Sequence, residues 1–70
     1  MNLTVIRMDS DEIEERYQYT PSVGDILITW RGRQRWYSPA DAAEALYNMS
    51  EERVPFYVAL WNGNYLIEMG

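Results

Sequence analysis

The stretch of sequence that decides the fold is FYVALWNGNYLIEM, residues 56–69. Two runs rich in aromatic and aliphatic residues flank Asn62-Gly63, a dipeptide that readily forms a two-residue β-turn. The stretch therefore predicts a β-hairpin with strands at 56–61 and 64–69.

The two faces of this hairpin differ, because side chains alternate along a strand. One face is almost entirely apolar, and we expect it to be a core face. It pairs Leu60 with Tyr65, Val58 with Ile67 and Phe56 with Met69. The reverse face is mixed and is either half-covered or open to a partner. Its candidate self-association centre is Tyr57, Trp61 and Leu66, so we expect a monomer or a homodimer.

Upstream of the hairpin, residues 39–49 predict an amphipathic helix. Ser38 is placed as its N-cap, Pro39 at its first position and Asp41 in its first turn, where negative charge is favoured. An apolar stripe recurs at helical spacing and indicates the side that lies on a sheet. The stripe consists of Ala42, Ala45, Leu46 and Met49.

A second hairpin is predicted around the Arg-Gly-Arg sequence of residues 31–33, between strands rich in β-branched and aromatic residues. Its register is open. A three-residue loop would place Ile28 beside Trp36, whereas a two-residue loop would place Trp30 beside Arg35. We favour the first, because it gathers Ile28, Trp36 and the preceding isoleucine on one core face.

The N-terminal third is less regular. Residues 3–8 predict a strand, and residues 17–19 extend a strand before a turn. Between them, Asp9 can cap a short helix, but Ile13 and Tyr17 are its only apolar pair. We expect either a helical turn or an acidic loop.

These elements predict an α+β fold: a small antiparallel sheet of four or five strands in two hairpins, with one amphipathic helix packed on one face. A chain of 70 residues cannot support two separate cores, so we expect a single domain over residues 1–70. The alternative is an SH3-like open barrel with the helix as a lid.

The composition excludes much chemistry, because the chain has no cysteine, no histidine and no lysine. Thiolate and imidazole catalysis, the usual zinc ligands and Schiff-base chemistry are therefore absent. We expect a non-enzymatic protein with no cofactor and no dedicated metal site. The start of the chain lacks a secretory signal and no run is long enough to span a membrane, so we expect a soluble, cytoplasmic protein with no membrane contact.

The densest charge feature is an acidic run in a chain of net charge −5. Carboxylates this close together project a negative field that can dock on a basic surface of a protein partner or imitate a phosphate backbone. The alternative is a solvated segment that only keeps the protein soluble. The candidate partner-binding residues are Asp9, Asp11, Glu12, Glu14 and Glu15, with the neighbouring Tyr17 and Tyr19.

The second candidate is the first hairpin, where arginines alternate with other residues between two tryptophans. Arginines pair with phosphates and exposed aromatic rings stack on unpaired bases, so the segment is an alternative nucleic-acid-binding site. The negative charge of the rest of the chain argues against this role. The arginines can instead protect a sheet edge or pair with the acidic run. The candidate residues are Trp30, Arg31, Arg33, Arg35 and Trp36.

In size, negative charge and absence of catalytic residue types, the chain resembles small phage-encoded proteins that inhibit host machinery, including polymerase and CRISPR inhibitors. Its order of strand, Ser-Pro-x-Asp-Ala helix and strand adds to the resemblance. The resemblance implies a non-enzymatic inhibitor or adaptor that docks on a nucleic-acid-handling surface of a partner protein.

Overall fold

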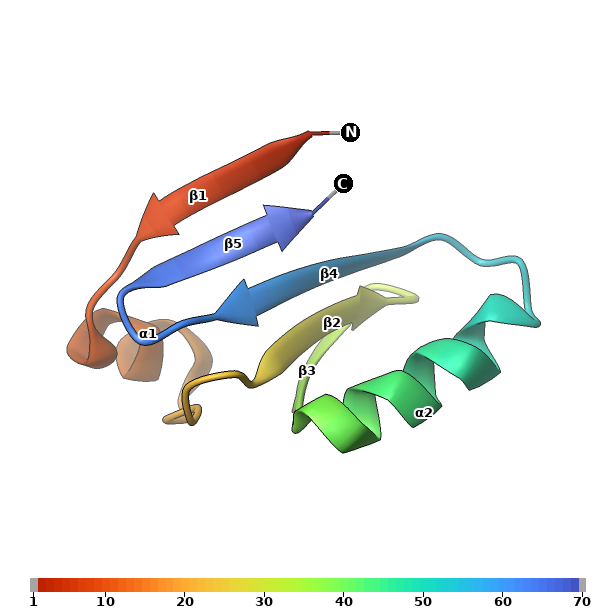
Figure 1. The fold of residues 1–70 in the computed structure, drawn as a ribbon, viewed down its shortest axis with the longest axis horizontal. Coiled ribbons are helices and arrows are strands. Elements are labelled where there is room, and N and C mark those ends of the chain that lie inside the picture. Colours follow the sequence, from red (N-terminus) through yellow and green to blue (C-terminus); the bar gives the residue numbers. More distant parts are fainter. Residues whose placement is uncertain (1, 70) are drawn as a thin grey trace.

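The computed structural model describes residues 2–69 and consists of one five-stranded antiparallel sheet and two helices (Figure 1). The strand order is β1-β5-β4-β2-β3, so the sheet is open, with β1 and β3 at its edges. This confirms the α+β class and its two hairpins and excludes the alternative barrel. The elements are β1 (Leu3–Arg7), α1 (Ser10–Tyr17), β2 (Ile26–Trp30), β3 (Arg33–Tyr37), α2 (Pro39–Ser50), β4 (Phe56–Trp61) and β5 (Tyr65–Met69).

Helix α2 forms as its capping residues and apolar stripe predict. The Ser38 hydroxyl accepts a hydrogen bond from the Asp41 amide at 3.3 Å, and Pro39 occupies the first turn. The buried Ala42 and Met49 pack on Ile28 of β2. Figure 1 shows α2 beside β2 and β3 and away from β1 and β5, so it covers only half of its face of the sheet.

Helix α1 replaces the expected helical turn or loop with two full turns. The Asp9 carboxylate accepts a hydrogen bond from the Glu12 amide at 2.8 Å, which confirms Asp9 as the cap. Ile13 is only 1% exposed and anchors the helix on the sheet. The helix ends where Gln18 adopts φ 54°, and this left-handed residue turns the chain. The expected strand at 17–19 is therefore wrong.

The first hairpin adopts neither of the two registers considered from the sequence. Its loop is Arg31-Gly32, and both residues have positive φ, 52° and 74°, as a type I′ turn requires. Leu27 therefore pairs with Trp36, on the face opposite Ile28. The expected grouping of Ile28 with Trp36 is wrong, and β2 is instead buried on both faces, through Leu27 and Ile28.

The C-terminal hairpin is shifted by two residues from the expected register. Leu60 pairs with Ile67 rather than with Tyr65, so the two-residue loop is Gly63-Asn64. The Asn62 side chain causes the shift, because its Oδ1 accepts hydrogen bonds from the amides of Asn64 and Tyr65 at 3.0 and 2.8 Å. A shift of two residues leaves every side chain on its expected face.

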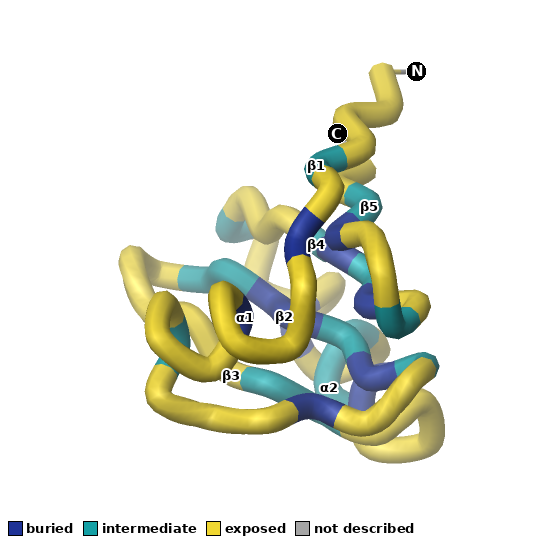
Figure 2. Tube along the Cα trace, turned by 90° about the vertical axis from the view of Figure 1, so that its left-hand side faces the viewer, coloured by how far each residue is buried: buried dark blue, intermediate teal, exposed yellow. Residues whose placement is uncertain are grey.

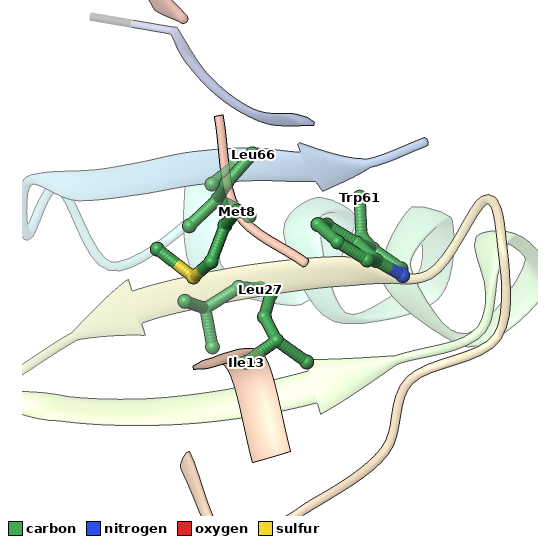
Figure 3. Close-up of a cluster of buried hydrophobic side chains, with 6 residues drawn as sticks. Met8, Ile13, Leu27, Trp61 and Leu66 are labelled. Carbon is green, nitrogen blue, oxygen red and sulfur yellow. The ribbon is translucent and has the colours of Figure 1, made fainter. Parts of the chain in front are cut away.

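The burial of those two faces is reversed. Trp61 and Leu66, on the expected mixed face, are each 2% exposed and form the main core with Ile13 of α1 (Figure 3). The expected core face is partly open, because α2 does not reach β1, β5 or β4 closely enough to cover it. Figure 2 shows the consequence, with the trace of β1 exposed over most of its length.

Substitution of Ile13 by alanine tests the anchoring of α1. We expect Ile13→Ala to lower the free energy of unfolding by about 2–5 kcal/mol, because it opens a cavity in the main core. Chemical denaturation monitored by tryptophan fluorescence measures the change. The matched control is Val23→Ala, at a side chain 72% exposed, which should change stability by less than about 0.5 kcal/mol. Equal effects of the two substitutions would contradict the described core.

Candidate functional site: an acidic helix beside an open groove

The acidic run becomes a rigid display of carboxylates on and just before α1. Because Ile13 points into the core, the acidic side chains of the helix are directed to solvent, and all of them are exposed. Asp11, Glu14 and Glu15 line a shallow depression together with Tyr19. The carboxylate of Asp9, just before α1, is engaged as the helix cap through its hydrogen bond from the Glu12 amide. The predicted acidic surface therefore exists with a fixed geometry.

These carboxylates are not neutralised within the molecule. Among residues 2–69, a single ion pair has its nitrogen and oxygen atoms within 4 Å of each other. It joins the Arg31 guanidinium to the Glu52 carboxylate at 3.7 Å. The expected alternative, in which the arginine-rich hairpin pairs with the acidic run, is therefore wrong for the described part of the chain. Arg16, in the last turn of α1, is the one basic side chain of that helix. The surface of α1 keeps a strong negative field.

Tyr17 and Tyr19 connect the acidic helix to the edge strand β3. The Tyr17 ring meets the Trp36 ring edge-on, with centroids 5.5 Å apart, and the Tyr19 ring stacks on it at 6.1 Å. Tyr17 is half-buried, whereas Tyr19 stays exposed. Of the two predicted contact tyrosines, Tyr19 is therefore the one more available to a partner.

A groove of about 430 Å³ lies on the same face of the sheet as α1, where the helix does not cover the strands. Its floor includes Leu27, Ala59 and Leu66, and Tyr17 connects it to α1. Glu68 is its one charged lining residue among those the structure describes. The sequence does not reveal this groove, because residues from all five strands and from the end of α1 build it together. Its polar rim includes Thr4, Thr29, Gln34 and Tyr57.

The arginine and tryptophan residues of the first hairpin are separated by the observed register. Trp30 packs with α2, and Trp36 packs with α1 on the opposite face. Both indole N–H groups are buried, without a hydrogen-bond partner in residues 2–69. Arg31 lies over the Trp30 ring at 4.8 Å, and Arg35 lies over the Tyr37 ring at 5.5 Å. Arg33 is exposed and pairs across the strands with Trp30, whereas Trp36 lies on the opposite face of the sheet.

The predicted self-association surface is interrupted by the core. Tyr57 is exposed, but Trp61 and Leu66 are buried in the main core together with Ile13 of α1. A surface centred on these three residues is therefore unavailable in the folded chain. Residues 2–69 contain no group of three carboxylates close enough to hold a metal ion. In the same range, no helix combines the length and apolar character needed to cross a membrane.

The separation of Trp30 from Trp36 leads to a prediction for nucleic acid. We expect a single-stranded oligonucleotide to leave the tryptophan fluorescence unchanged at low salt, because the two rings lie on opposite faces of the sheet and each packs against a core cluster. A fluorescence titration measures this directly. Saturable quenching that disappears in Trp36→Phe would contradict the described packing.

No family model, no curated protein and no solved structure matches the chain. Similarity therefore assigns no role to any residue. The features of the molecule that bear on its function are the acidic helix, the groove and their chemistry.

Proposed function

We propose that the protein is a non-enzymatic protein-binding module that docks on a basic surface of a partner protein. The observation that carries the proposal is the display of exposed carboxylates on α1, a helix fixed in orientation by the buried Ile13 and lacking intramolecular ion pairs among the described residues. Such an array attracts a basic surface and orients it before contact.

The rigidity of α1 favours specific binding over simple solubility. A flexible acidic loop would lose conformational entropy when it docks, whereas a helix already held by Ile13 and capped by Asp9 loses less. Ile13 stabilises the core whether or not the acids bind a partner, but its anchoring also holds the carboxylates of α1 in one arrangement. The fixed array therefore supports a binding role for Asp11, Glu12, Glu14 and Glu15.

The groove extends the proposed binding face. Tyr17 belongs to α1 and also lines the groove, so the two features are adjacent on one side of the sheet. The tyrosine rings of Tyr17 and Tyr57, with the carboxylate of Glu68, suit the alkyl stem and guanidinium of an arginine side chain. A basic partner would thus contact α1 with several cations and place one in the groove.

A partner that handles nucleic acid is the kind that best fits this face. Its basic surface binds phosphates, and a rigid row of carboxylates competes for the same cations. The protein would then act in the cytoplasm as a competitive inhibitor or adaptor, the role implied by its resemblance to phage-encoded inhibitors. Binding nucleic acid itself is the weaker alternative, because the first hairpin places its two tryptophans on opposite faces of the sheet.

Charge reversal on α1 tests the proposal. We expect Glu14→Arg with Glu15→Arg to weaken binding to a captured basic partner by about tenfold or more, because both side chains are exposed on the proposed face. Partners are first captured from a lysate with the wild-type protein and identified by mass spectrometry. Affinity is then measured for the purified partner between about 0.05 and 0.5 M salt.

The matched control is Glu44→Arg with Glu51→Arg, which makes the same charge change at exposed positions in and just after α2. This variant should bind within about twofold of the wild type, because its charges lie outside the proposed face. Circular dichroism verifies that both variants are folded. If capture by the folded Glu14 and Glu15 variant is unchanged, the proposed function is wrong.

A further inference from the structure

The face of the sheet that carries α2 is apolar but only half covered. Beyond the helix, strands β1, β5 and β4 expose a continuous row of large hydrophobic side chains. Five of them are between 36% and 59% exposed: Leu3, Val5, Phe56, Tyr65 and Met69. Val58, Leu60 and Ile67 lie between them on the same face and are half-buried. We name this set of eight residues the uncovered face.

The area of the uncovered face suits a weak and reversible interface. The five most exposed side chains present on the order of 400 Å² to solvent, within the range of functional patches on small proteins. Two copies would bury about 800 Å² together through these side chains, below the 1,200 Å² or so of most stable complexes. Such an interface predicts association that depends on protein concentration.

The distribution of charge favours a second copy as the occupant. In a chain of net charge −5, the uncovered face contains no carboxylate, and Arg7 is the one charged residue on that face of β1. Glu68 points to the opposite face, as do the acids displayed by α1. Two uncovered faces can therefore meet with both sheets between their acidic helices. The distance between these helices then exceeds the Debye length of about 8 Å, so their mutual repulsion is screened.

The two edge strands of the sheet differ in their protection against pairing with another strand. Edge strand β3 carries Arg33 and Arg35, which discourage pairing with another strand. Edge strand β1, with the sequence LTVIR, has no charge before its last residue, no proline and no glycine. The unprotected edge therefore adjoins the uncovered face, as expected if both are protected by the same contact.

We propose that the uncovered face is the interface of a homodimer, in which two sheets pack face to face about a twofold axis near β5. Stacked sheets lie about 10 Å apart. The sheet of the second copy therefore covers β1, β5 and β4 in the same layer in which α2 covers β2 and β3. In this arrangement β5 lies over its equivalent, β1 lies over β4 of the partner, and each free β1 edge lies beside the partner's α2. The contact is isologous, so it closes after two copies.

Sedimentation velocity over a range of concentrations tests the dimer. We expect the wild-type mass to rise from one chain toward two chains as the protein is concentrated to about 1 mM. Val5→Lys should remain at one chain over this range, because it places a charge at the centre of β1 on the uncovered face. The matched control is Tyr47→Lys on the outer side of α2, 70% exposed, which adds the same charge and should dimerise as the wild type does.

Dilution of the wild-type protein, followed by NMR, keeps the test independent of any variant. The concentration-dependent shifts should fall on Leu3, Val5, Tyr65 and Met69 and spare α1. A wild type that stays at one chain throughout, a folded Val5→Lys that dimerises like the wild type, or shifts centred on α1 would each overturn the proposal. The variant with Glu14→Arg and Glu15→Arg should still dimerise. Loss of partner binding and loss of dimerisation can therefore be distinguished from each other.

Discussion

The burial of β2 between two short helices is the constraint on which the structure depends. Leu27 faces α1 and Ile28 faces α2, so this strand lies under both helices. Helices of 8 and 12 residues cannot cover both faces of a five-stranded sheet, and each leaves part of its face open. The groove beside α1 and the uncovered face beside α2 are the two results of that shortage.

The proposed roles of the molecule follow from this division. One face combines the carboxylates of α1 with a groove that contains Glu68, and this chemistry suits the basic partner that we propose. The opposite face combines an apolar surface with an unprotected edge, and its chemistry selects for another apolar surface. A homodimer would present two acidic faces on its outer sides, which would raise the avidity for a partner with repeated basic sites.

The sequence predicts the elements better than their arrangement. Local signals are sufficient for α2, where Ser38, Pro39 and the apolar stripe all agree, and for the positions of the strands. The expected registers of both hairpins are wrong, because single residues in the turns decide them. Arg31 adopts a left-handed conformation, and the Asn62 side chain accepts a hydrogen bond from the Asn64 amide in its turn. The acidic residues and the Asp9 cap are predictable from the sequence, but the full length of α1 is not, because the contacts of Ile13 with distant strands stabilise the helix. Such long-range contacts are not visible in the sequence. For the same reason the sequence does not predict the groove, and the expected burial of the two faces of the C-terminal hairpin is the reverse of the observed one.

The proposed binding role requires the acidic run to be an anchored helix and not a solvated loop. Nuclear Overhauser contacts from the Ile13 methyl groups test it most directly, because they report distances within the core. An anchored helix gives contacts from these methyls to Leu27, Trp61 or Leu66, which belong to the same buried cluster. Ile13 methyls that show contacts only to their sequence neighbours would mean that the acidic segment is not anchored on the sheet.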